Sequence, residues 1–516
     1  MRPTISRRTF LQASTGAALL PLSGAGSRVL AQDATSLTIR SEADIGSLDP
    51  ANPVGVIDGV IIRAVCQTLA SFKANALEWE PDAAKTLTQV SDTEITVALN
   101  PGQMYTGDYG EMTADAVKFS LERYITPAAD GSLPTGAGDF AALDHVEVTG
   151  TYTGRILLKN PSPSLWIVGL CDSGGAILSR KATEALGKDI ATKIIGSGPY
   201  ALTDWQPGQQ IVLEQRADFA GANKGAFQKV VIKPIVEPRT ALLSLLAGEI
   251  ALSEVDSQDF AQIEAAEGIV AVKTPRIDYT WIGMNVEKPA LSDVRVRQAL
   301  RLGIDVDTIL AGAYGGAELR ANALLAPGLI GHWADAPVHA RDLEKAKALL
   351  VEAGQSGLTI TFTYLKDALS EATAQIVQAN LAEIGVTVTL NGMEQAVYYG
   401  LGDNDADKVL DLTLITFSGK NDPGFQTQWF TGSQISTWNW ERWANAEFDQ
   451  LDAEARSILD PAARAEKYIR MQQIMDESAA FVWITNGTFV YGHAKWLTPA
   501  ILPGGPSWQL RHFALA

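Results

Sequence analysis

The first 31 residues constrain this chain most, because they predict where it folds and where it works. They contain Ser6-Arg7-Arg8-Thr9-Phe10-Leu11, a weakly apolar stretch, and then Val29-Leu30-Ala31. Adjacent arginines before an aromatic residue and a leucine are typical of a twin-arginine export signal. Val29-x-Ala31 fits a signal-peptidase site, and no acidic residue precedes Asp33. We therefore expect cleavage near Ala31, passage through the twin-arginine translocase as a folded protein, and a periplasmic location.

The alternative is an ordinary amphipathic N-terminus with a chance Arg-Arg pair. The order of the three parts favours the export signal. Removal of residues 1–31 removes four arginines and no acid, so the formal charge falls from −18 to −22. Such a charge argues against nucleic acid and against anionic membrane surfaces as partners. It suits a protein that self-repulsion keeps monomeric.

The length and the pattern of predicted elements indicate two lobes. About 485 residues is long for a single core, and no apolar stretch after the signal reaches the roughly 18 residues of a membrane span. The second half predicts a βαβ unit over Leu358–Leu390 and two further helices, whereas the first half is richer in hairpins. A helix is also predicted over Gly59–Phe72.

Five segments, in order, resemble the family 5 solute-binding proteins of ABC importers, the peptide, nickel and opine type. The most specific is the third, because its long Asn-then-Val-Arg-x-Ala-Leu order is unusual. The segments are Glu80-Pro81-Asp82-Ala83-Ala84 through Thr113-Ala114-Asp115-Ala116-Val117; Gly196-Ser197-Gly198-Pro199-Tyr200; Gly283-Met284-Asn285 with Asp293-Val294-Arg295-Val296-Arg297-Gln298-Ala299-Leu300; Ala346-Lys347-Ala348-Leu349-Leu350; and Asn421-Asp422-Pro423.

The resemblance implies an α/β, two-lobed periplasmic-binding-protein type II fold with an extra small domain. The ligand would lie in the cleft between the lobes, hinge closure would capture it, and permease subunits in the inner membrane would receive it. No cofactor or catalysis is implied. The expected division is a signal peptide over 1–31, lobe I over 32–72, 190–284 and 482–516, an inserted subdomain over 73–189, and lobe II over 285–481.

The same resemblance places the ligand against the loop after the first strand, the strand that follows the central hinge, and the segment before Asp-Pro. Gly55 and Val56 would offer a backbone edge to an extended ligand, although a surface loop shaped by nearby prolines is an equal alternative. The expected ligand-binding residues are Gly55, Val56, Tyr279, Trp281, Asn285, Phe417, Gly419, Lys420, Asp422, Trp438 and Trp440.

One departure from the family pattern changes the expected ligand. The peptide-binding branch often carries Gly-Trp-x-x-Asp before the Asp-Pro pair, and its Asp binds the peptide ammonium. The corresponding positions here are Ile415, Thr416 and Gly419, and Lys420 adds a positive charge. The sequence therefore favours a ligand with hydroxyls, a carboxylate or a modified amine over an ordinary peptide.

Aromatic residues form the other strong signal. Trp438 and Trp440, with Trp429 and Trp443 nearby, would suit a glycoside, a sugar–amino-acid conjugate or an aromatic ligand. Packing of a long loop against the lobe is the alternative. If the segment is extended, Trp438 and Trp440 point the same way and one of them could line the cleft.

Metal binding and catalysis have weaker support. The five histidines are dispersed, so no protein metal site is expected, and Cys66 and Cys171 are expected to be buried free thiols rather than a disulfide. A secreted glycoside or amide hydrolase is the alternative function. Its carboxylates would come from Asp403, Asp405 and Asp407, which lie in a Gly/Asn/Asp run typical of a solvated loop.

Overall fold

The computed structural model describes residues 35–403, 405–505 and 507–516. The predicted export signal and its cleavage site lie outside these ranges. Within them, no helix is both long enough and apolar enough to cross a lipid bilayer.

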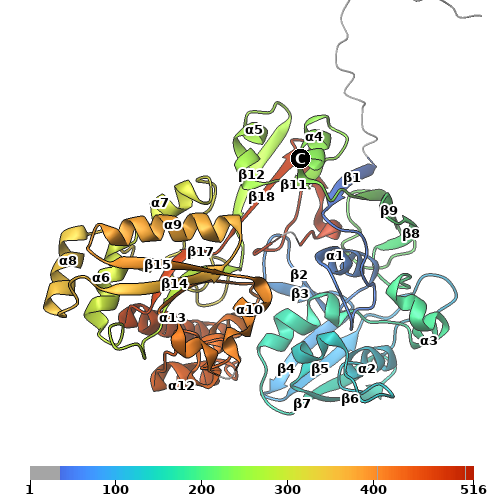
Figure 1. Ribbon diagram of the computed structural model, residues 1–516. Helices are drawn as coiled ribbons and strands as arrows, with labels where there is room; N and C mark the ends of the chain where they lie inside the picture. Colours follow the sequence, from blue (N-terminus) through green and yellow to red (C-terminus); the bar gives the residue numbers. More distant parts are fainter. Residues whose placement is uncertain (1–34, 404, 506) are drawn as a thin grey trace, which may run out of the picture. The chain divides into compact units, whose positions relative to one another are not determined.

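The first lobe is built on two small sheets (Figure 1). Apolar residues alternate along its first strand, so that Leu37 and Ile39 are buried in the core under helix α1 (Val56–Val65). The four-stranded sheet has the order β1 (Ser36–Ser41), β10 (Lys229–Pro234), β9 (Gln210–Gln215) and β8 (Tyr200–Gln206). The three-stranded sheet has the order β11 (Leu252–Glu254), β18 (Thr488–Ala494) and β12 (Ile269–Pro275), with helices α4 (Pro238–Leu246) and α5 (Phe260–Glu264).

An inserted segment forms its own antiparallel sheet with a separate core. Within it, β6 (Leu143–Gly150) and β7 (Thr153–Leu158) pair antiparallel as a hairpin. The strand order of this inserted sheet is β4 (Ala84–Ser91), β5 (Glu94–Leu99), β7 and β6. Helices α2 (Ala114–Glu122) and α3 (Arg180–Leu186) accompany it.

The helix predicted over Gly59–Phe72 is only partly right. The helix ends at Val65, where Cys66 turns to an extended conformation. The following residues form strand β2 (Ala70–Phe72), because they pair antiparallel with β3 (Trp79–Pro81). This hairpin leads directly into the inserted sheet.

The second lobe contains a five-stranded mixed sheet between layers of helices (Figure 1). The predicted βαβ unit is confirmed, since β14 and β15 pair in parallel and α9 connects them. The strand order is β15 (Thr387–Met393), β14 (Thr359–Leu365), β16 (Leu412–Phe417), β13 (Tyr279–Met284) and β17 (Phe481–Thr485). The helices are α6 (Val294–Gly303), α7 (Val306–Gly312), α8 (Leu343–Glu352), α9 (Ala368–Ala382), α10 (Gln395–Tyr399), α11 (Pro423–Thr427), α12 (Ala446–Ala455) and α13 (Pro461–Ser478).

Strand pairing differs from the predicted division between the lobes. The expected boundaries at 284 and 482 leave β13 and most of β17 in lobe I, whereas both strands belong to the sheet of the second lobe. The chain therefore passes between the lobes at 276–278 and at 486–487. These two segments are joined by a hydrogen bond of 3.0 Å from the N–H of Arg276 to the carbonyl of Gly487. The chain ends in a short pair, β19 (Leu497–Thr498) and β20 (Ala514–Leu515).

Candidate ligand-binding site

A cavity of about 260 Å³ lies where the loop after β1, the inserted segment and the second lobe meet. Two of the predicted binding residues, Gly419 and Lys420, line it. The remaining lining comes mostly from segments that the sequence did not single out. The full lining is Pro50, Pro53, Tyr124, Gly136, Asp139, Phe140, Val168, Asp172, Ser173, Gly174, Ile277, Gly419, Lys420 and Asn421.

Tyr124 fixes the wall that the first lobe and the inserted segment contribute. Its hydroxyl lies 2.9 Å from the carbonyl oxygen of Pro50 and 2.7 Å from that of Gly174, both within hydrogen-bond distance. Its ring stacks on Phe140 with centroids 3.9 Å apart. A Cβ at Gly136 would lie 3.0 Å from the Tyr124 ring, so the chain passes close against the tyrosine here. The short helical turn Thr135–Phe140, which carries Asp139, is thereby held in place.

One ion pair spans the cavity. The Lys420 ammonium lies 2.6 Å from Oδ1 of Asp139, which joins the second lobe to the inserted segment. The same ammonium lies 5.0 Å from the centre of the Phe425 ring, a cation–π distance. The cavity thus offers a carboxylate on one wall and an ammonium on the other, and the Phe425 ring lies beside the ammonium without lining the cavity.

Gly419 has no room for a side chain. A Cβ there would lie 2.1 Å from the carbonyl oxygen of Ile277 and 2.7 Å from the amide nitrogen of Gln426. The backbone of 419 is therefore packed against the segment that crosses between the lobes. An aspartate at this position, as in the peptide-binding pattern, would require the backbone itself to move.

A group of half-buried aromatic rings lies next to this loop. Phe417 contacts Trp438 at 5.7 Å and Trp429 at 6.4 Å, and Trp429 contacts Phe425 at 5.7 Å, all between ring centroids and all edge-on. We call Phe417, Phe425, Trp429 and Trp438 the aromatic face. It retains partial exposure and continues to Lys420, so it extends the set of groups that a ligand could contact.

Tyr279 and Trp281 lie beneath the aromatic face rather than on it. Both rings are fully buried, and Phe417 packs on them at 5.9 and 5.2 Å. We expected them to contact the ligand directly, but they do not line the cavity. Strand β13 is the second strand from the edge of the sheet and is covered on both faces. Their contribution is to support Phe417.

The loop at Gly55 and Val56 does not offer the expected strand edge. The N–H groups of Val54 and Gly55 both donate to Oδ2 of Asp58 at 3.0 Å, and Val56 is already the first residue of α1. The N–H groups of Val54 and Gly55 are therefore not available to pair with an extended ligand. Val56 is 56% exposed and lines a separate cavity of about 140 Å³ with Glu254 and Trp508.

Three other predicted residues have structural roles. The amide of Asn285 is buried and donates to the carbonyl of Leu410 at 3.0 Å. Asp422 is buried against Arg464, whose two terminal nitrogens contact its carboxylate at 2.6 and 2.8 Å, and it also caps α11. Trp440 is 1% exposed and packs on Tyr398 at 5.1 Å. None of the three presents a side chain to the cavity.

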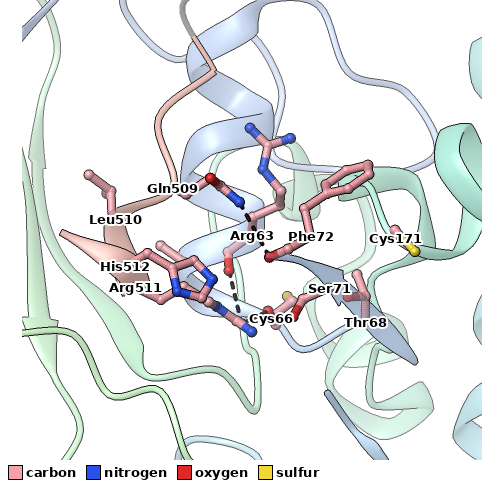
Figure 2. A pocket seen from close by; sticks show the side chains of 11 residues that line it. Arg63, Cys66, Thr68, Ser71, Phe72, Cys171, Gln509, Leu510, Arg511 and His512 are labelled. Atoms are coloured by element: carbon pink, nitrogen blue, oxygen red, sulfur yellow. Dashed lines mark hydrogen bonds between the residues drawn. The ribbon is translucent and has the colours of Figure 1, made fainter. Parts of the chain in front are cut away.

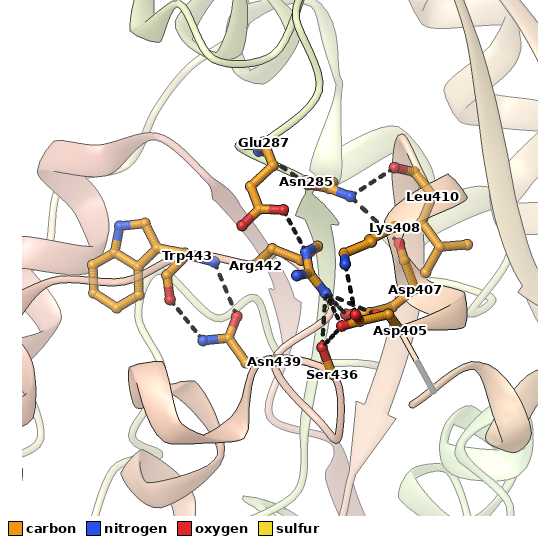
Figure 3. A network of polar contacts seen from close by, with 10 residues as sticks. All are labelled: Asn285, Glu287, Asp405, Asp407, Lys408, Leu410, Ser436, Asn439, Arg442 and Trp443. Atoms are coloured by element: carbon orange, nitrogen blue, oxygen red, sulfur yellow. Dashed lines mark hydrogen bonds and ion pairs between the residues drawn. The ribbon is translucent and has the colours of Figure 1, made fainter. Parts of the chain in front are cut away.

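Arg442 organises a polar network that includes Ser436, two residues before Trp438 (Figure 3). Its guanidinium contacts both oxygens of the buried Asp407 at 3.0 and 3.1 Å and also reaches Glu287 and Ser436. Hydrogen bonds from Lys408 and Ser436 lower the pKa of Asp405 to about 2. Two of the carboxylates considered for a hydrolase, Asp405 and Asp407, are thus paired with Arg442 and Ser436 in the loop that carries Trp438, whereas Asp403 is exposed.

A third cavity, of about 20 Å³, lies between the end of α1 and the C-terminal segment (Figure 2). Arg511 pairs with Asp82 at 2.9 Å beside it, and both cysteines line it. Cys66 and Cys171 are free and buried, as the sequence predicts, and burial raises the pKa of Cys66 to about 12. The space suits about one ordered water rather than a ligand.

Asp139, Tyr124 and Asp172 were missed by sequence reasoning. Their signal is weak but real: Asp139 follows Gly136-Ala137-Gly138, and Asp172 precedes Ser173-Gly174-Gly175. Glycine-rich turns bordered by a carboxylate are places where the backbone comes close to a neighbour or a ligand.

Two sheet-based lobes with a charged cavity between their segments are the architecture of a solute-binding protein. The chain belongs to the bacterial extracellular solute-binding proteins, family 5, whose model matches residues 78–437. These proteins serve ABC importers and are not enzymes.

Individual relatives cover almost the whole chain. The probable D,D-dipeptide-binding periplasmic protein DdpA of Escherichia coli is 27% identical over 501 residues, 94% of each chain. The glutathione-binding protein GsiB of Pectobacterium atrosepticum is 24% identical over 510 residues, 96% of each chain. The solved structure of HbpA2 from Haemophilus parasuis has the same fold, with a TM-score of 0.84 at 23% identity over 93% of this chain and 100% of that one.

Proposed function

We propose that this protein captures a small peptide-like, opine or sugar-conjugate ligand in the 260 Å³ cavity by hinge closure. The closed protein then delivers the ligand to an ABC permease. The observation that carries the proposal is the placement of Asp139 and Lys420 on opposite walls of the cavity. Asp139 comes from the inserted segment, and Lys420 comes from the second lobe. A ligand that contacts both walls stabilises the arrangement in which they face each other, which is how a binding protein couples occupancy to shape.

The names of the relatives support the peptide-like class. DdpA and GsiB are named for D,D-dipeptides and glutathione, which are small and carry amine and carboxylate groups. The aromatic face adds apolar area next to the charged pair, so side chains or rings of the ligand would pack there.

Native mass spectrometry of the protein purified from its own periplasm tests the proposal. We expect a co-purifying small molecule that denaturation releases, with a mass that distinguishes a peptide, an opine and a sugar conjugate. An empty protein that also shows no thermal shift across panels of these three classes would contradict the proposed ligand classes.

Export through the twin-arginine translocase as a monomer completes the proposal. Replacing Arg7 and Arg8 together by lysine is expected to abolish periplasmic arrival, because the translocase reads the arginine pair. The check is immunoblotting of periplasmic and cytoplasmic fractions, with Arg28→Lys as the matched control. Unchanged periplasmic arrival of the double variant would refute the assigned route.

A further inference from the structure

Asp139 differs from the other carboxylates near the cavity in where its partner comes from. Asp49 and Asp172 are each paired within the first lobe and its inserted segment, at 2.8 and 2.5 Å, and Asp422 is paired within the second lobe. Their partners are Arg123, Arg63 and Arg464. Only Asp139, among these four, is held by a side chain from the opposite wall, that of Lys420.

The two members of this pair are anchored very differently. Asp139 lies in a turn that is fixed by the stacking of Phe140 on Tyr124 and by the tyrosine hydroxyl. Lys420 is 40% exposed on a loop, at the end of a flexible four-carbon side chain. The carboxylate is therefore a preorganised acceptor, whereas the ammonium can leave without disturbing the fold.

From this asymmetry, and resting on the proposed function, we propose that Lys420 marks the position of the ligand's own ammonium. A ligand ammonium takes the place of Lys420 at Asp139, and the released Lys420 receives a carboxylate of the same ligand. The protein then selects zwitterions, because a ligand with one charge leaves either Lys420 or Asp139 unpaired in a partly desolvated cavity.

The packing of Gly419 supports this assignment. Since no side chain fits at 419, the second lobe cannot supply an acceptor at that position. Asp139 lies on the opposite wall and contacts the residue that follows Gly419 in the same loop, Lys420. An ammonium acceptor is thus present in the cavity, but it comes from the inserted segment.

Isothermal titration calorimetry with alanyl-alanine, in its L,L and D,D forms, tests the proposal. The N-acetyl and C-amide forms of the same dipeptides remove one charge each. For the wild type we expect each blocked form to bind about tenfold to a hundredfold more weakly than the zwitterion. Asp139→Asn should no longer distinguish the free amine from the acetylated one, and Lys420→Met should no longer distinguish the carboxylate from the amide.

Asp92→Asn and Lys345→Met, both at exposed positions away from the cavity, are matched controls and should keep the wild-type pattern. Equal affinity of the wild type for blocked and free forms would overturn the proposal, as would undiminished discrimination in Asp139→Asn. If Asp139→Asn folds poorly, Lys420→Met still tests the proposal, because Lys420 is partly exposed on a loop and its replacement should not disturb folding. Absence of binding to every form, or a co-purified ligand without an amine, overturns this inference while leaving the importer function standing.

Discussion

Replacing Trp440 by alanine is expected to destabilise the second lobe by about 3–5 kcal/mol, the usual cost of removing a buried aromatic side chain from a core. Trp440 is 1% exposed, packs on Tyr398, and donates its indole N–H to the carbonyl of Thr437 at 3.0 Å. Truncation would leave a cavity that the surrounding helices cannot fill. Chemical denaturation followed by fluorescence measures the loss.

Trp438→Ala is expected to behave in the opposite way. Its ring is half-buried on the aromatic face, so less packing is lost, whereas the ligand loses a stacking partner. We expect the affinity to fall about tenfold, on the scale of one aromatic contact. Calorimetry with the ligand identified by mass spectrometry gives the affinities of both variants.

Trp205→Ala is the control for the tryptophan pair. Trp205 is half-buried in the first lobe, where its indole donates to Asp44 at 2.8 Å, so its removal should reduce stability without changing affinity. A Trp440→Ala variant with unchanged stability would show that this part of the core is not as packed as described. A Trp438→Ala variant with unchanged affinity would remove Trp438 from the ligand site.

The two tryptophans also show what the sequence could and could not predict. Alternation in an extended strand would place Trp438 and Trp440 on one face, but residues 436–438 form a turn and Ser436 has a φ of 67°. A single left-handed residue changes which side chain reaches the surface. Sequence periodicity contains no signal for such a turn.

Elements with a local signature were predictable. The βαβ unit over β14, α9 and β15 follows from helical and strand periodicities that alternate along the chain. The boundary between the lobes was not predictable from the sequence. Every residue of β13 is buried, and the sequence of a fully buried strand does not reveal which sheet it joins. The cavity wall around Asp139 depends on Tyr124, Pro50 and Gly174, which are brought together only by the tertiary fold.

The second large effect concerns pH. Glu441 is fully buried, and burial raises the pKa of its carboxyl from 4.5 to about 7. One oxygen accepts the Trp281 indole N–H at 2.7 Å, and the other has no partner among the described residues. A Cβ at Gly283 would lie 1.9 Å from the first oxygen, so the sheet backbone closes directly over this group.

Because the folded-state pKa lies above the unfolded one, the protonated carboxyl contributes stability that is fully present below about pH 4.5. That contribution is lost as the pH rises to about 7. The loss is on the order of 3 kcal/mol at pH 8, from the difference in pKa values. Glu441→Gln keeps an acceptor for Trp281 and carries no charge, so we expect it to be more stable than the wild type at pH 8 and similar at pH 4.5.

The measurement is the difference in unfolding free energy between Glu441→Gln and the wild type, at several pH values between 4.5 and 8. Other titrating groups cancel in this difference, including Glu254, whose pKa burial raises to about 8. Glu447→Gln is the matched control, since Glu447 is exposed and its hydrogen bond from Arg470 lowers its pKa. A constant difference across this range would mean that Glu441 is ionised in the folded protein. The support of Phe417 by Trp281 would then rest on a buried charge rather than a neutral acid.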